Sequence, residues 1–158
     1  MIKSFPFKSI LIVCSVNTAR SPMAEGFLKD YFSKNKLEIK VQSCGISSHA
    51  RDDMLISRDA IDAMKEVGID LSEESLSMDL KRHPELLEGL DLILTLTDKH
   101  KREVMEFNSV DNIKIYTLKE FAGEYGDIND PSMKGLDGFR IARDEIIDCL
   151  TKGIIKKS

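Results

Sequence analysis

The sequence predicts an α/β fold in which a single doubly wound domain, residues 1–158, is built on a four-stranded parallel sheet flanked by helices. Short apolar runs that are rich in β-branched residues recur along the chain, as expected for parallel strands buried on both faces. Stretches with helical spacing alternate with these runs, which is the order of right-handed βαβ units. The chain is also long enough to bury one hydrophobic core.

The first strand and the helix after it are the clearest elements. Residues 9–15, SILIVCS, have the composition of a buried strand. Ser21 is expected to cap the following helix, and Pro22 to be its first residue. A tight loop between strand and helix is therefore expected, and we predict that it binds phosphate.

The later elements continue the alternation. The segment at 123–135, which is rich in Gly and Asp, is expected to be a loop after the fourth strand. Because the carboxyl ends of parallel strands lie at one edge of a sheet, Cys14 and Asp130 are expected at the same edge. The expected elements are strands at 37–43, 91–96 and 112–118, and helices at about 60–67, 97–107 and 138–150.

Composition argues against several classes of function. A net charge of −4 and a pI near 5.4 offer no basic face for nucleic acid. No apolar run approaches the roughly 20 residues that span a bilayer, so we expect no membrane partner and a cytoplasmic protein. Three widely spaced cysteines and three scattered histidines predict neither a disulfide framework nor a metal site, and no cofactor is expected.

Cys14 and Arg20 bracket the predicted loop. A loop that closes on a helix N-terminus presents backbone N–H groups and the helix dipole to a dianion, and the Arg20 guanidinium would grip two phosphoryl oxygens. The same field favours the thiolate of Cys14, to which Ser21 is placed to donate a hydrogen bond. The alternatives are an ordinary buried cysteine at Cys14 and a simple turn at Asp130-Pro131.

The segment VCSVNTARSPMAE, together with Asp130-Pro131, resembles the low-molecular-weight protein tyrosine phosphatase family. The resemblance implies a protein phosphatase that forms a phosphocysteine intermediate, with phosphorylated proteins as partners and inorganic phosphate as product or inhibitor. It implies Cys14 as nucleophile, Arg20 as clamp, and Asp130 as general acid and then base. It assigns phosphate binding and loop support to Ser15, Val16, Asn17, Thr18, Ala19, Ser21 and Ser43.

Three positions depart from the family pattern. Val16 stands where the family usually has glycine, which relieves backbone strain. Ala19 replaces a second cysteine that can protect the nucleophile, and Glu73 replaces a histidine found behind the loop in many relatives. The departures in the loop leave open a second hypothesis, a catalytically impaired module that binds phosphate or phosphoproteins. The nucleophile, the clamp and the acid are all retained, which favours the enzyme.

The family includes tyrosine phosphatases, arginine phosphatases and arsenate reductases. Arsenate reductases need further redox cysteines in mid-chain, and none lies between Cys44 and Cys149, so this activity is disfavoured. Thr18 resembles the arginine type, whereas tyrosine-type members tend to carry a larger aliphatic residue there. Ser132 and Met133 stand where tyrosine-type enzymes tend to have aromatic residues that flank a phenyl ring. The sequence therefore leans slightly to phosphoarginine.

Overall fold

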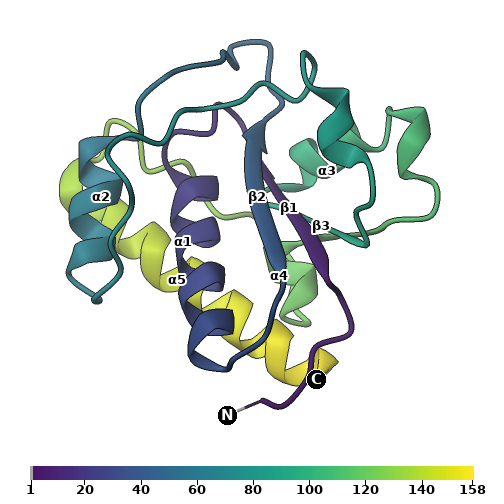
Figure 1. Ribbon diagram of the computed structural model, residues 1–158. Helices are drawn as coiled ribbons and strands as arrows, with labels where there is room; N and C mark the ends of the chain where they lie inside the picture. The colour runs from purple at the N-terminus through teal and green to yellow at the C-terminus, as the bar shows by residue number, and fades with distance from the viewer. Residues whose placement is uncertain (1) are drawn as a thin grey trace.

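The structure, a computed structural model that describes residues 2–158, is built on one parallel sheet with the strand order β2-β1-β3-β4 (Figure 1). Each neighbouring pair of strands is parallel. The predicted fold class, a four-stranded parallel sheet flanked by helices, is confirmed. The strands are β1 Ser9–Cys14, β2 Lys40–Gly45, β3 Leu92–Thr95 and β4 Lys114–Thr117.

Helices cover both faces of the sheet, and within residues 2–158 none has the length and apolar composition needed to cross a bilayer. Helices α1 and α2 both pack against the long helix α5, whereas α3 contacts β3 and β4 on the other face (Figure 1). The helices are α1 Arg20–Lys34, α2 Arg58–Lys65, α3 Asp98–Val104, α4 Leu118–Phe121 and α5 Gly135–Lys157, with 3-10 turns at Pro84–Leu87 and Asn108–Val110.

Strand β1 is buried on both faces because its side chains alternate between two hydrophobic clusters. Ile10, Ile12 and Cys14 join the cluster formed with α1, α2 and α5. Leu11 and Val13 join the cluster on the face covered by α3. All five residues are at most 2% exposed. This burial on both faces fixes the position of Cys14 at the end of the strand.

The second strand begins later than predicted, because residues 37–39 lie outside β2. The backbone N–H of Leu37 donates to the carbonyl of Phe32, and Lys36 has a φ of 58°. These residues therefore close the C-terminus of α1 in a left-handed turn. The alternating pattern that predicted a strand at 37–43 contains this turn, and the strand runs instead to Gly45.

The last helix is longer than the predicted 138–150, since α5 continues to Lys157. Gly153 and Ile154 are buried in its additional turns and hold this end against the rest of the protein. Lys156 Nζ also donates to the carbonyl oxygen of Ala122, at 2.9 Å. The extra length therefore follows from contacts with α4 and the residue after it.

We expect Gly153→Ala to destabilise the protein, although alanine is normally the better helix former. A Cβ at this position would overlap the ring of Phe121, which is itself only 2% exposed. Overpacking of a core typically costs about 1–3 kcal/mol. Urea unfolding measures the change, with Ile155→Ala as the control on the exposed face of the same helix. A loss no larger than that of the control would contradict this packing.

Candidate active site

Cys14 lies at the carboxyl end of β1, and residues 14–20, named here the Cys14 loop, connect this strand to α1. Cys14 is 2% exposed. Its Sγ atom lies 2.9 Å from Ser21 Oγ, and the backbone N–H of Asn17 donates to the same sulfur over 3.3 Å. The loop therefore folds back over the sulfur and directs a backbone donor at it.

The side chain of Asn17 decides which way the Ser21 hydroxyl points. Asn17 Nδ2 donates to Ser21 Oγ at 2.9 Å. An amide nitrogen is only a donor, so Ser21 accepts this bond and keeps its own proton for the sulfur of Cys14. The sulfur of Cys14 therefore faces two donors, the Ser21 hydroxyl and the backbone N–H of Asn17.

Ser21 is not the N-cap that the sequence predicts. Helix α1 begins at Arg20, with Ala19 as the N-cap residue and no side-chain capping hydrogen bond. The Ser21 hydroxyl is engaged by Cys14 and Asn17 instead. The helix N-terminus therefore has no capping side chain, and its N–H groups and dipole favour an anion at this end.

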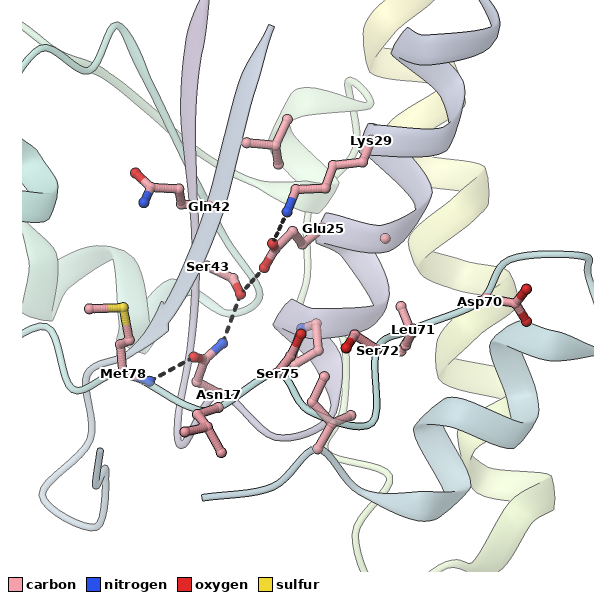
Figure 2. Close-up of a pocket in the computed structure, with 15 residues that line it drawn as sticks. Asn17, Glu25, Lys29, Gln42, Ser43, Asp70, Leu71, Ser72, Ser75 and Met78 are labelled. Atoms are coloured by element: carbon pink, nitrogen blue, oxygen red, sulfur yellow. Dashed lines mark hydrogen bonds and ion pairs between the residues drawn. The ribbon is translucent and has the colours of Figure 1, made fainter. Parts of the chain in front are cut away.

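Polar contacts brace the Cys14 loop from behind (Figure 2). Asn17 Nδ2 also donates to Ser43 Oγ at 2.9 Å, and the backbone N–H of Met78 donates to Asn17 Oδ1 at 2.9 Å. Ser43 in turn donates to Glu25, and Glu25 pairs with Lys29 at 2.6 Å. Asn17 and Ser43, each predicted to support the loop, are thus in direct contact with one another, and Glu25 extends this set of contacts.

Two of the three departures from the family pattern lie in the loop, and Ala19, one of them, has a φ of −132° and a ψ of −82°. Asn17 has a φ of 63°, a value that asparagine tolerates better than most residues. Val16 is not among the residues with positive φ, so its position does not demand glycine. Glu73 does not reach the back of the loop and pairs with Arg58 at 2.6 Å on the surface. The carbonyl of Thr18 accepts a hydrogen bond from the backbone N–H of Ser57 at 2.8 Å.

Arg20 ties the Cys14 loop to the segment that carries Asp130. The residue is 5% exposed, and its Nη1 atom donates to the carbonyl of Ile128 at 2.8 Å. Its Nη2 atom donates to Ser15 Oγ at 3.2 Å and lies 3.9 Å from Asp130 Oδ2. Among the residues that the structure describes, this buried guanidinium has a carboxylate nearby but no bidentate partner.

Asp130 is half exposed and lies on the open side of Arg20. Burial raises the pKa of Asp130, but the hydrogen bond from the Ser132 N–H and the positive charges of Arg20 and Lys134 outweigh it and bring the pKa below its ordinary value. Ser132 and Met133 follow on the exposed surface, and Met133 has a φ of 71°. The free protein therefore holds Asp130 as a carboxylate.

His100 is a residue of this site that the sequence analysis did not identify. It lies in the first turn of α3, is 3% exposed, and places its Nε2 atom 2.8 Å from Ser15 Oγ. Burial, and then the charge of Arg20, lower the pKa of His100 to about 4. The predicted order of strands and helices could have identified His100, since α3 follows β3 at the same carboxyl edge as Cys14.

The loop that follows β2 closes one wall of the site. The backbone N–H groups of Ile46 and Ser47 both donate to the carbonyl of Ser15. Gly45 makes this close approach possible, because a Cβ there would lie 2.8 Å from the Ser15 carbonyl oxygen and 2.9 Å from the backbone of Val16. The wall therefore presses directly on the Cys14 loop.

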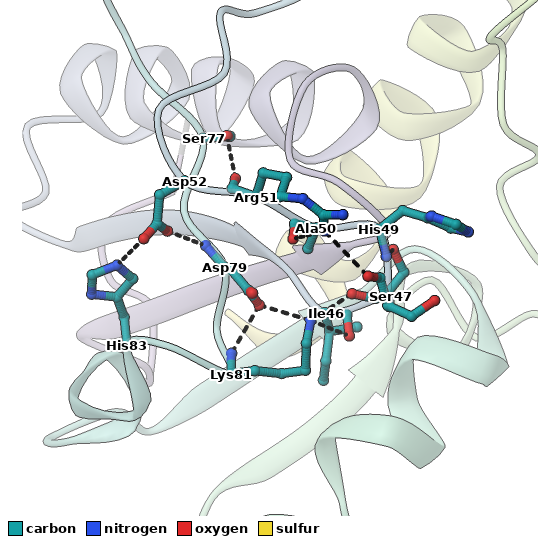
Figure 3. A network of polar contacts seen from close by, with 11 residues as sticks. Ile46, Ser47, His49, Ala50, Arg51, Asp52, Ser77, Asp79, Lys81 and His83 are labelled. Atoms are coloured by element: carbon teal, nitrogen blue, oxygen red, sulfur yellow. Dashed lines mark hydrogen bonds and ion pairs between the residues drawn. The ribbon is translucent and has the colours of Figure 1, made fainter.

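A polar network holds this wall in place (Figure 3). Lys81 Nζ bridges Asp79 Oδ1, at 2.8 Å, to the carbonyl of Ile46, at 3.2 Å. Asp52 accepts the backbone N–H of Asp79 at 2.8 Å and contacts His83 Nε2 at 2.9 Å. The hydrogen bond with Asp52 raises the pKa of His83. The wall is therefore anchored by charged groups.

A cavity of about 430 Å³ lies beside the hydrogen-bonded residues behind the loop rather than at Cys14. Its walls include Asn17, Glu25 and Ser43, and none of the three predicted catalytic residues lines it (Figure 2). Within residues 2–158, no group of three or more His, Cys, Asp or Glu side chains is placed to hold a metal ion. The candidate site is therefore defined by converging hydrogen bonds and charges.

Comparison with known proteins places this arrangement in a family. A family model described as low molecular weight phosphotyrosine protein phosphatase matches residues 9–156. A protein-arginine-phosphatase from Bacillus subtilis (strain 168) is 33% identical over 142 residues, which cover 89% of this chain and 91% of that protein. A low molecular weight protein tyrosine phosphatase from T. tengcongensis has a TM-score of 0.84 at 31% identity, over 94% of this chain and 99% of that chain.

A YwlE arginine phosphatase mutant with a phosphorylated active-site serine has a TM-score of 0.83 at 32% identity, over 94% of each chain. The chain therefore belongs to the low molecular weight phosphotyrosine protein phosphatase family, as the resemblance predicted.

Arsenate reductases are also similar to this chain. That of Shouchella clausii is 38% identical over 56% of each protein, and arsenate reductase 1 of Staphylococcus haemolyticus is 32% identical over 88% of this chain and 89% of that protein.

We expect Gly45→Ala to reduce phosphatase activity more than it reduces stability. The added methyl group would push on the backbone of Ser15 and Val16 and displace the loop N–H groups, and such small displacements from catalytic geometry commonly cost about 100-fold in rate. Steady-state rates and urea unfolding together test this. Gly26→Ala is the control, because its Cβ would crowd only the flexible end of the Leu71 side chain and would make an ordinary contact with Ile69. Equal losses of activity in both variants would contradict the prediction.

The burial of His100 predicts a pH-dependent stability. The unfolded chain takes up a proton on this ring below its ordinary pKa of about 6.5, whereas the folded protein resists protonation down to about 4. Stability is therefore lost as the pH falls from 6.5 to 4, by up to about 3 kcal/mol from this group. The free energy of unfolding of wild type minus that of His100→Gln should shrink across this window. A difference that stays constant would contradict a buried neutral imidazole.

Proposed function

We propose that this protein is a cysteine-dependent protein phosphatase that hydrolyses phosphorylated protein side chains through a phosphocysteine intermediate, with phosphoarginine favoured over phosphotyrosine. The observation that carries the proposal is the hydrogen bond between Ser21 Oγ and Cys14 Sγ, 2.9 Å long, beside the uncapped start of α1. Arg20 is buried next to it, and Asp130 lies 3.9 Å from Arg20 on the open side.

In the first step the Cys14 thiolate attacks phosphorus while Arg20 and the loop N–H groups hold the phosphoryl oxygens. The S–P bond forms as the P–N or P–O bond breaks, and Asp130 gives its proton to the leaving atom. Arg20 helps to keep the pKa of Asp130 low in the free protein. A bound phosphoryl dianion opposes that field, so substrate binding raises the pKa and favours the protonated acid.

In the second step the Asp130 carboxylate takes a proton from a water molecule, whose oxygen attacks phosphorus. The S–P bond breaks, the thiolate of Cys14 is restored, and inorganic phosphate leaves. The phosphorylated active-site serine of the YwlE arginine phosphatase mutant supports a covalent intermediate of this kind. The positive charge that the reaction needs comes from Arg20 and from backbone N–H groups.

Two observations favour phosphoarginine. Thr18 provides a small polar wall where a larger aliphatic side chain would suit a phenyl ring. Ser132 and Met133 are exposed and contribute no aromatic side chain after Asp130. Overall similarity does not separate the two substrates, since the protein-arginine-phosphatase of B. subtilis and the protein-tyrosine-phosphatase PtpB of Staphylococcus haemolyticus are each 33% identical, over 89% and 90% of this chain. A guanidinium leaving group would find the carboxylate of Asp130 at the open side of the site.

Neither alternative gains support from the site. An impaired phosphate-binding module was suggested by Val16 and Ala19, and the backbone of Val16 does not occupy the positive φ region. An arsenate reductase would need a second cysteine within reach of Cys14. Cys44 lies in the hydrophobic cluster on the opposite face of the sheet from Cys14. Burial raises the pKa of the Cys44 thiol, which makes it unreactive.

We place the enzyme in the cytoplasm, with phosphorylated proteins as substrates and inorganic phosphate as product and competitive inhibitor. Cys14, Cys44 and Cys149 are all free thiols, as suits a reducing compartment. The net charge of −4 offers no attraction to nucleic acid or to anionic lipids.

Initial rates on a phosphoarginine peptide and a phosphotyrosine peptide, measured in EDTA, test the proposal. Wild type should hydrolyse the phosphoarginine peptide with the higher kcat/KM, and Cys14→Ser should have no activity on either peptide. Asp130→Asn should lower kcat on both, by about 100-fold or more, because it removes the acid.

Arg58→Gln is the matched control, since Arg58 pairs with Glu73 on the surface. It should leave kcat/KM unchanged, whereas Arg20→Gln should abolish turnover. Turnover that survives in Cys14→Ser, or that disappears in EDTA, would exclude the thiolate mechanism. Absence of turnover together with normal phosphate affinity would instead establish the binding module.

A further inference from the structure

Ser15 Oγ is the meeting point of two hydrogen bonds that the mechanism above does not use. His100 Nε2 lies 2.8 Å from this oxygen, and Arg20 Nη2 donates to it over 3.2 Å. Both partners are buried, at 3% and 5% exposure, whereas Ser15 is partly exposed at the edge where the site opens. The position of the Ser15 hydroxyl is therefore fixed from the inside of the protein.

The second ring nitrogen of His100 indicates where the ring carries its proton. His100 Nδ1 is buried and has no hydrogen-bond partner in the part of the chain that the structure describes. A neutral imidazole has one N–H donor and one bare acceptor nitrogen. A buried N–H without an acceptor is rarer than a buried acceptor without a donor. The geometry therefore favours the tautomer with the proton on Nε2.

With the proton on Nε2, the Ser15 oxygen accepts two hydrogen bonds, one from His100 and one from Arg20. A hydroxyl has two lone pairs and one proton. Both lone pairs are then occupied, and the proton has to point in a third direction, away from both donors. Neither of the two buried partners can receive it, so the proton is available to a group that binds at this partly exposed edge.

We infer that His100 is a positioning residue that turns the Ser15 hydroxyl into a fixed hydrogen-bond donor for the phosphoryl group held by Arg20. The inference rests on the proposed function and adds one side-chain donor to a cradle of backbone N–H groups. A donor whose direction is set in advance needs no reorganisation when an anion arrives. Without His100 the hydroxyl would accept only the hydrogen bond from Arg20, its proton would have more than one direction open to it, and part of this advantage would be lost.

Three variants separate this role from a merely structural one. Ser15→Ala should weaken the binding of inorganic phosphate, and lower kcat/KM, by about tenfold or more, the usual loss for a hydrogen bond to a charged group. His100→Asn should behave in the same way, because its amide reaches only the position of Nδ1. His100→Gln should restore most of the wild-type affinity, because its amide nitrogen reaches the position of Nε2.

The double variant Ser15→Ala/His100→Asn should bind phosphate no more weakly than Ser15→Ala does, since both substitutions remove the same interaction. Calorimetric titration with inorganic phosphate gives the affinities without any need for turnover. Thermal unfolding identifies a variant that has not folded. If His100→Asn does not fold, then Ser15→Ala and the measurement of the tautomer test the inference without it.

Nitrogen-15 NMR of the His100 ring in the wild-type protein reports the tautomer directly. The inference expects a protonated Nε2 and a bare Nδ1 near pH 7. A proton on Nδ1, or phosphate affinities of Ser15→Ala and His100→Asn equal to that of wild type, would overturn it. A wild type that binds phosphate in a His100-dependent manner but turns over neither peptide would overturn the proposed function and leave this inference standing.

Discussion

The hydrogen bonds of one side chain, Asn17, hold the candidate active site together. Its amide nitrogen donates to both Ser21 and Ser43, and its amide oxygen accepts the N–H of Met78. The first of these bonds turns the Ser21 proton to Cys14, and the others anchor the loop to β2 and to the segment before the first 3-10 turn. The backbone N–H of Asn17 also reaches the sulfur, so the shape of the loop and the hydrogen bonds to the sulfur depend on the same residue.

The charges around this loop explain why the site is suited to an anion. Arg20 is almost completely buried, and a buried cation is costly unless it is paired and hydrogen bonded. Its partners in the free protein are a carbonyl, a hydroxyl and a carboxylate 3.9 Å away. A phosphoryl group would complete this set and at the same time face the uncapped start of α1. Binding and the change in protonation of Asp130 therefore depend on the same electrostatic field.

The sequence predicted the fold class, the order of the strands along the chain and the edge at which the site lies, because burial and topology follow from local patterns. It did not predict that Ser21 would leave the N-cap to Ala19, since the hydrogen bond to Cys14 depends on how the loop folds. It also missed His100, which contacts Ser15 in the loop, and Glu25, which contacts Ser43 behind it; both side chains come from helices and show no spacing signal relative to Cys14. The periodicity of apolar residues predicts each helix and strand, but it does not predict the side-chain contacts between elements.

The central claim is that Cys14 carries the phosphoryl group during turnover. Rapid acid quench of the enzyme while it turns over a phosphorylated peptide, followed by mass spectrometry of the digest, measures this directly. The account predicts one added phosphoryl group on the peptide that contains Cys14, and none on that peptide from Cys14→Ser, which lacks the thiolate. Sustained turnover with no label on Cys14, or with the label on another residue, would contradict the account.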